Sequence, residues 1–204
     1  MTRPSCKEVC KIVADSSKND IVVITMSTMK VFPTIAPDAY FVSSVPLMGG
    51  AGSIGMGIAI ARPDKQIWVL DGDASLLMEL GSLVTIAEAA PQNFVHILFN
   101  NQVQYGGTAN LDLPGGGRVD FSSMAISAGY PIARKIKSSH ELLEFISSLK
   151  SNKGPIFLDV DVEPDASYYD ENTPQKEIFD HQLHRMGEEA RRVKEILTNI
   201  PLSD

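Results

Sequence analysis

Two short apolar segments, each ending abruptly in polar residues, restrict the fold of this chain more than any other feature. Residues 67–70 (Ile-Trp-Val-Leu) run into the polar residues 71–75, and residues 94–99 run into the polar residues 100–103. Between them, apolar residues recur at steps of three and four from Leu76 to Ala87, which predicts a helix. A strand, a helix and a second strand form a βαβ unit, so this pattern predicts an α/β domain with a mainly parallel sheet.

The two polar ends are expected to lie next to each other. Right-handed crossovers make the two strands parallel, which brings both ends to the same carboxyl edge of the sheet. Asp73 and Asn101 are therefore expected to be neighbours. A carboxylate and an amide oxygen beside a helix N-terminus suit Mg²⁺ or Ca²⁺ holding a phosphorylated ligand. The alternative is a βαβ edge at which these side chains only cap turns and bind no metal.

The same residues resemble the signature of a known enzyme family. Gly72-Asp73-Ala74-Ser75, followed by Asn100-Asn101, resembles the GDG…NN motif of thiamine-diphosphate (ThDP) enzymes. The resemblance covers residues 20–165 and implies the diphosphate-binding domain of that family, a three-layer α/β/α fold with a mainly parallel sheet. It also implies that Asp73, Asn101 and the main-chain carbonyl of Val103 ligate Mg²⁺, which holds the diphosphate. Ala74 stands where the family usually has Gly, and the spacing leaves open whether Asn100 or Asn101 is the ligand.

Two further segments are assigned to the cofactor by this resemblance. Ser27 and Thr28 follow an expected strand and would donate to the diphosphate, although they could equally cap a turn. Met48 would hold the bent shape of the cofactor, and the carbonyl of Pro46 would accept from its amino group; the alternative for Met48 is a core methionine. The full set of expected cofactor-binding residues is Ser27, Thr28, Pro46, Leu47, Met48, Gly49, Gly72, Asp73, Ala74, Ser75, Asn101, Val103, Tyr105 and Gly106.

Two other motifs compete with this interpretation. Gly50, Gly52 and Gly55 spell G-x-G-x-x-G after an expected strand, with Asp71 further on, which is the outline of a dinucleotide-binding fingerprint. Asp71 and Asp73 spell D-x-D, a metal motif of nucleotide-sugar transferases. Both alternatives leave the Asn pair unexplained.

Composition narrows the class of protein. A chain of 204 residues, 44% apolar and 21% charged, can bury a full core. Its net charge of −7 argues against a nucleic acid or an anionic membrane as partner. The sequence has no apolar run long enough to span a membrane and no signal-peptide pattern, so we expect a cytoplasmic protein. Cys6 and Cys10 are one helical turn apart and are expected to be reduced thiols.

The remaining patterns outline the other elements. Strands are expected at residues 21–25, 41–45, 132–136 and 155–162, and helices at 5–17, 53–61, 121–128 and 139–149. The domain is expected to span residues 1–165, followed by an extension over 166–204. Thr173 and Pro174 favour a helix start there. Apolar residues then recur along one face of this expected helix, and we expect that apolar stripe to dock on this domain or on another subunit. The stripe consists of Phe179, Leu183, Met186, Ala190, Val193 and Leu197.

The resemblance also implies a partner. ThDP catalysis needs a glutamate that the family supplies from a separate pyrimidine-binding domain, and this chain has room for one domain only. The chain is therefore expected to be the diphosphate-binding (beta) subunit of a two-chain 2-oxo acid decarboxylase of the sulfopyruvate or phosphonopyruvate type. Such an enzyme releases CO₂ and an aldehyde, works with a pyrimidine-domain alpha subunit in an α2β2 or larger assembly, and takes no catalytic residue with certainty from this chain. Lys30 and Arg118 are the candidates for contact with an anionic substrate.

Three other functions stay open at this stage. They are an acetolactate-synthase-like carboligase subunit, an NAD-binding dehydrogenase, and a non-catalytic subunit with the ThDP fold.

Overall fold

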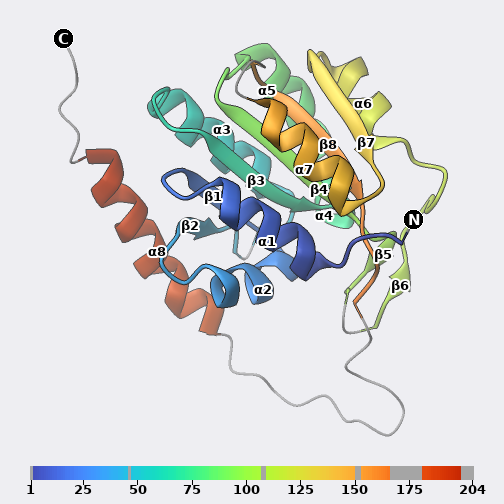
Figure 1. Cartoon of the computed structure of the whole chain (residues 1–204), viewed down its shortest axis with the longest axis horizontal. Coiled ribbons are helices and arrows are strands. Elements are labelled where there is room, and N and C mark those ends of the chain that lie inside the picture. Colours follow the sequence, from blue (N-terminus) through green and yellow to red (C-terminus); the bar gives the residue numbers. More distant parts are fainter. Residues whose placement is uncertain (1, 46, 107–108, 150–152, 166–180, 199–204) are drawn as a thin grey trace, which may run out of the picture.

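The computed structural model describes residues 2–45, 47–106, 109–149, 153–165 and 181–198, which form one parallel sheet with helices on both faces (Figure 1). The sheet order is β2 (Tyr40–Ser43), β1 (Ile21–Ile24), β3 (Ile67–Gly72), β4 (Phe94–Asn100), β8 (Ile156–Asp161) and β7 (Ile132–Ile136), and all neighbours are parallel. A small antiparallel ribbon joins β5 (Val103–Gln104) to β6 (Leu111–Asp112). The helices are α1 (Cys6–Ser16), α2 (Ser27–Ile35), α3 (Gly50–Ala61), α4 (Asp73–Met78), α5 (Ser82–Ala89), α6 (Phe121–Ala128), α7 (Ser139–Ser148) and α8 (His181–Thr198).

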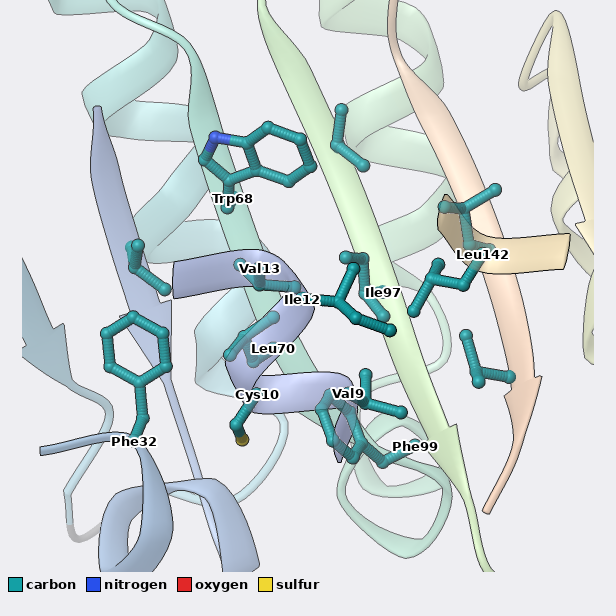
Figure 2. Close-up of a cluster of buried hydrophobic side chains, with 14 of the residues drawn as sticks. Val9, Cys10, Ile12, Val13, Phe32, Trp68, Leu70, Ile97, Phe99 and Leu142 are labelled. Carbon is teal, nitrogen blue, oxygen red and sulfur yellow. The ribbon is translucent and has the colours of Figure 1, made fainter. Parts of the chain in front are cut away.

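Strand alternation divides the core into two layers. Val22 and Ile24 face the cluster formed with α1, α2 and α7, whereas Ile21 and Val23 face the cluster formed with α3 to α6. Figure 2 shows the first of these layers, in which the apolar face of α1 lies over the central strands. Burial of each large aliphatic side chain contributes about 1.5–3 kcal/mol. The three-layer α/β/α prediction is therefore confirmed.

Local signals set several helix ends. Ser5 and Glu8 form a capping box at α1, in which the Glu8 amide donates to Ser5 Oγ (3.3 Å) and the Ser5 amide donates to Glu8 Oε2 (2.8 Å). Asp120 caps α6 by accepting from the Ser123 amide (2.9 Å), and Ser138 caps α7. These caps begin the helices at or within one residue of the positions that the sequence predicts.

One prediction about elements was wrong, and one choice between two alternatives is decided by the sheet order. The single helix expected after Gly72 is two helices, because the chain leaves the helical conformation at Glu79 (φ −133°) and resumes it at Ser82. The acidic residues of the last strand were expected to mark either a sheet edge or the carboxyl end of the strand; β8 lies between β4 and β7, and Asp159 and Asp161 stand at its carboxyl end, so the second alternative holds. Helix α2 is not indicated by the sequence pattern; it starts at the tip of β1 and contains Pro33.

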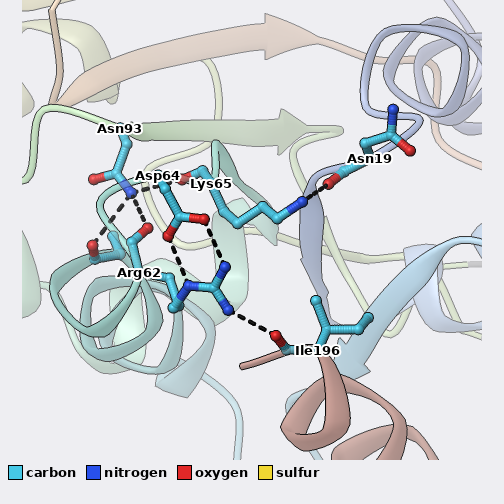
Figure 3. A network of polar contacts seen from close by, with 7 residues as sticks. Asn19, Arg62, Asp64, Lys65, Asn93 and Ile196 are labelled. Carbon is cyan, nitrogen blue, oxygen red and sulfur yellow. Dashed lines mark hydrogen bonds and ion pairs between the residues drawn. The ribbon is translucent and has the colours of Figure 1, made fainter. Parts of the chain in front are cut away.

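The described part of the extension, helix α8, packs alongside the edge strand β2 (Figure 1). Glu189 accepts from the Ser43 amide (2.8 Å) and from Arg185 Nε (2.6 Å), so a backbone donor of the edge strand is paired. Figure 3 shows Arg62, which is paired with Asp64, donating to the carbonyl of Ile196 in α8 (2.7 Å). Of the two docking surfaces expected for the stripe, the described part of α8 uses the first. The predicted helix start at Thr173 and Pro174 lies outside the described residues.

Within the described ranges, no helix combines the length and the apolar character needed to cross a membrane.

Candidate functional site

A cavity of ≈ 290 Å³ lies at the carboxyl ends of the central strands. The chain passes from β1 outward to the edge strand β2 and then returns to β3 on the other side of β1, which makes this point a topological switch, the usual ligand position in such sheets. The register pairs Gly72 with Phe99 and Asn100 with Asp161, so the ends of β3, β4 and β8 are adjacent. The lining consists of Thr25 to Lys30, Asp71 to Ser75, Val103 to Gly106, and Cys6, Met48, Met78, Phe99, Asn101, Val162, Glu163 and Asp165.

Asp73 meets the turn after β4, as the sequence predicts. Its Oδ2 accepts from the Gln102 amide (2.6 Å) and its Oδ1 accepts from the Ala74 amide (2.7 Å). The side chain is buried, and this burial raises the pKa of Asp73 to about 6, helped by the nearby charge of Asp159 and opposed by the two amide donors. A carboxylate held in this way gains from a cation placed beside it.

The two asparagines of the pair have different surroundings. Asn101 lines the cavity, and its Oδ1 accepts from the Val103 amide (3.1 Å). Asn100 is buried and donates through Nδ2 to Asp159 Oδ1 (2.8 Å), away from the lining. Of the two, Asn101 is therefore the side chain in position to contact a ligand in the cavity.

The segments of Ser27 and of Gly106 approach each other closely in the cavity. A Cβ added to Gly106 would lie 3.4 Å from Ser27 Oγ and 3.2 Å from Asn101 Nδ2. Thr28 is differently placed, because its buried hydroxyl donates to the Thr25 carbonyl (2.7 Å) and accepts from the Thr25 amide (3.1 Å). Ser27 thus faces the cavity with its hydroxyl near the loop, whereas the Thr28 hydroxyl is used within its own turn.

The segment expected beneath a cofactor is only partly on the lining. Met48 lines the cavity, whereas Leu47 is exposed and Gly49 donates from its amide to Ser75 Oγ (2.8 Å). Pro46 lies outside the described residues. The other expected residues, Gly72, Ala74, Ser75, Val103 and Tyr105, are on the lining. Ala74 lies within α4 and has no positive φ, so its position does not require glycine.

The structure gives the residues of the two competing motifs different contacts. Asp71 and Asp73 both line the cavity, but Asp71 pairs with His96 (3.2 Å) whereas Asp73 accepts from the Ala74 and Gln102 amides, so the two carboxylates of the D-x-D motif have different partners. Gly52 and Gly55 lie inside α3, where they face the side chains of Ile86 and Val69. Among the described residues no three His, Cys, Asp or Glu side chains gather as a metal cluster.

Several lining residues carry no local sequence signal. Glu163 and Asp165 follow β8 and reach the cavity only because β8 pairs with β4.

Of the two residues that the sequence offers for contact with an anionic substrate, Lys30 lines the cavity and Arg118 does not. The acids on the lining thus outnumber its lysine.

The burial of Asp73 predicts how stability depends on pH in the absence of metal. A carboxyl group whose pKa is raised on folding contributes stability that is present below its unfolded pKa, and this is lost as pH rises through the folded value near 6. Relative to Asp73→Asn, the wild-type free energy of unfolding should therefore increase by about 2–2.5 kcal/mol from about pH 7 to about pH 4. Urea denaturation of both proteins in EDTA measures this difference in the free energy of unfolding. A difference that stays constant between about pH 4 and about pH 7 would contradict the raised pKa of Asp73.

Comparison with known proteins places the chain in a family. Residues 20–160 match the family model described as thiamine pyrophosphate enzyme, C-terminal TPP binding domain. The chain belongs to this family. Thiamine pyrophosphate is the same compound as ThDP, so the resemblance drawn from Gly72-Asp73 and Asn100-Asn101 is confirmed.

Relatives within the family include decarboxylases. The chain is 30% identical to the phosphonopyruvate decarboxylase of Streptomyces viridochromogenes over 158 residues, which cover 76% of this chain and 38% of that protein. It is 35% identical to the sulfopyruvate decarboxylase subunit beta of Methanothermobacter thermautotrophicus over 117 residues, covering 57% of this chain and 59% of the relative. The ThDP-dependent 4-hydroxybenzoylformate decarboxylase of Rhodococcus jostii RHA1 shares the fold, with a TM-score of 0.63 at 22% identity over 80% of this chain and 33% of that one. The chain thus spans between about a third and three fifths of these proteins.

Proposed function

We propose that this chain is the diphosphate-binding subunit of a two-chain, ThDP- and Mg²⁺-dependent decarboxylase that acts on a 2-oxo acid of the sulfopyruvate or phosphonopyruvate type and yields CO₂ and an aldehyde. The observation that carries the proposal is the contact between Asp73 and the turn at residues 101–103, inside a cavity at the switch point of the sheet. The relatives named as decarboxylases support the proposed reaction class.

The residues on the lining fit a magnesium diphosphate. Asp73, Asn101 and the carbonyl of Val103 offer the oxygen ligands that Mg²⁺ prefers, leaving its other positions to water and phosphate oxygens. The bond from the Val103 amide orients the Asn101 side chain before any ion arrives. Ser27 and the backbone at Gly106 would contact the diphosphate, and Met48 would contact the organic part of the cofactor. Bound ThDP supplies the electron sink that permits loss of CO₂ from a 2-oxo acid.

A partner chain is proposed from the surface around the cavity. Two apolar side chains of its rim are strongly exposed, Met78 at 56% and Tyr105 at 68%, and the adjacent Leu47 is 56% exposed. Large apolar groups gathered at a cavity mouth are typical of interfaces. The relatives named subunit beta support a second kind of chain, and the pyrimidine-domain subunit is the one that would complete the cofactor site. The proposed assembly is α2β2 or larger.

The cavity's charge also favours a partner. Asp71, Asp73, Glu163 and Asp165 line it against Lys30, so this half offers little attraction to a substrate with a second anionic group. The cations for a sulfonate or phosphonate would therefore come mainly from the partner, with Lys30 as the contribution of this chain.

The experiment is reconstitution of this chain with a pyrimidine-domain chain, followed by CO₂ release from sulfopyruvate, phosphonopyruvate and pyruvate. We expect release only with ThDP, Mg²⁺ and both chains present, and fastest from one of the two acidic substrates. Acetolactate formed from pyruvate would replace the proposal by a carboligase, and an assembled pair that binds no ThDP would indicate a non-catalytic subunit. NAD binding by this chain alone and without metal would exclude the proposal.

A further inference from the structure

Asn100 is hydrogen-bonded to strand β8 and the residue after it through both its side chain and its main-chain carbonyl. Its side-chain Nδ2 donates to Asp159 Oδ1 (2.8 Å), and its carbonyl accepts from the Val162 amide (3.0 Å). Asn100 itself is only 2% exposed and Asp159 is fully buried. The residue that precedes the cavity turn is therefore fixed to the neighbouring strand rather than to the cavity.

The turn that follows Asn100 is narrow and has several geometric constraints. Gln102 has a positive φ of 63°, which is uncommon for a residue with a side chain. Its amide donates to Asp73 and its carbonyl accepts from the Leu113 amide (2.9 Å). A shift of Asn100 would move the whole turn, including the Asn101 side chain and the Val103 carbonyl.

Burying the carboxyl group of Asp159 costs desolvation free energy, and its contact with Asn100 is what offsets that cost. Its Oδ1 accepts from Asn100, while Oδ2 accepts no hydrogen bond from the described residues and lies 3.9 Å from Lys135 Nζ. Lys135 is nearer to Asp161, at 3.1 Å. Burial raises the pKa of Asp159, in keeping with a carboxyl group that lacks compensation for its lost water. An apolar side chain at this position would avoid that desolvation, so the Asn100 contact is the interaction that the carboxyl group specifically provides.

We propose that Asp159 is a positioning residue for the metal site: by holding Asn100, it places the turn at residues 101–103 so that Asn101 and the Val103 carbonyl can receive the divalent ion. This inference rests on the proposed function, because it takes the ion from there. Asp159 does not line the cavity and touches no ligand in it. Residues that orient metal ligands in this indirect way typically change metal affinity 10- to 100-fold when they are removed.

The test uses the full-length chain with Mn²⁺ and inorganic diphosphate, which probe this half of the site without the partner or catalysis. The dissociation constant of Mn²⁺ is measured from the electron paramagnetic resonance signal of the free ion. The measurement is made without urea, after each variant has been shown to be folded. Asp159→Ala should weaken Mn²⁺ binding by about 10- to 100-fold. Asp159→Asn should restore affinity to within about threefold of wild type, because the amide oxygen can still accept from Asn100. Asp161→Ala is the matched control on the same strand and should leave affinity unchanged.

Asn100→Ala tests the same contact from the other side and serves if Asp159→Ala does not fold. It should weaken Mn²⁺ binding by a similar factor, and the double variant should lose little more, since both single changes remove one interaction. Equal affinities for Asp159→Ala and Asp161→Ala would overturn the inference, as would Asp159→Asn binding as weakly as Asp159→Ala. If the wild-type chain fails to bind Mn²⁺ with diphosphate, the metal site of the proposed function fails instead.

Discussion

Asp73→Asn is expected to weaken Mg²⁺-dependent binding of diphosphate more than 100-fold while the protein stays folded. The change removes the single carboxylate among the proposed ligands, and a neutral amide is a far poorer partner for a divalent ion. Without metal, two effects on stability nearly cancel. Loss of a buried charge with a pKa near 6 stabilises the variant by about 3 kcal/mol at neutral pH. Loss of an acceptor for one of the two amides at residues 74 and 102 costs about 1–3 kcal/mol.

Isothermal titration with Mg²⁺ and inorganic diphosphate measures the binding, and urea denaturation in EDTA measures the stability. The matched control is Glu163→Gln, which removes one negative charge from the lining of the same cavity. It should change the affinity less than fivefold. Binding by Asp73→Asn that equals binding by this control would refute the metal assignment.

Gly49→Ala is expected to lower the free energy of unfolding by about 2–4 kcal/mol. Gly49 has a φ of 86°, a left-handed conformation that costs a residue with a Cβ about 1–2 kcal/mol. An added Cβ would lie 2.6 Å from Glu79 Cβ, where the neighbouring atom belongs to the start of a side chain and cannot swing away. Such overpacking costs about a further 1–3 kcal/mol. The Gly49 amide also donates to Ser75, which fixes its position. Any backbone shift that relieves the clash would therefore move the adjacent residue Met48.

Gly57→Ala is the control for this prediction. Gly57 lies inside α3, the helix that Gly49 precedes as N-cap, and an added Cβ there would meet no atom within 4 Å. Alanine should therefore stabilise that position by about 0.5–1 kcal/mol through helix propensity. Denaturant unfolding of the two variants should give shifts of opposite sign, and a Gly49→Ala protein as stable as Gly57→Ala would show that the loop tolerates the change.

Much of the secondary structure is readable from local patterns. The expected segments at residues 121–128 and 132–136 coincide with α6 and β7, and the start of α6 is marked by its Asp120 cap. The break between α4 and α5 escapes such patterns, since the apolar spacing continues through it and the backbone departs only at Glu79. Helix α2 escapes them as well, because Pro33 and a start at a strand tip suggest a loop.

Part of the site was also predictable from local patterns. Asp73 and Asn101 each follow an apolar run, and parallel strands bring such ends to one edge of the sheet. Eleven of the expected residues line the cavity, namely Ser27, Thr28, Met48, Gly72, Asp73, Ala74, Ser75, Asn101, Val103, Tyr105 and Gly106. Their roles toward metal and cofactor stay predictions until binding is measured.

The residue types and their spacing thus determine the α/β class and the edge of the sheet where polar groups meet, because strand alternation, helix periodicity and turn chemistry are local properties of the chain. The family is indicated separately, by the resemblance of Gly72-Asp73 and Asn100-Asn101 to its motif. Only the tertiary structure decides between neighbours such as Asn100 and Asn101. The register that places β8 beside β4 sets Asp159 against Asn100 and leaves Asn101 facing the cavity. That register depends on packing between residues far apart in the sequence, so no pattern within a single segment contains it.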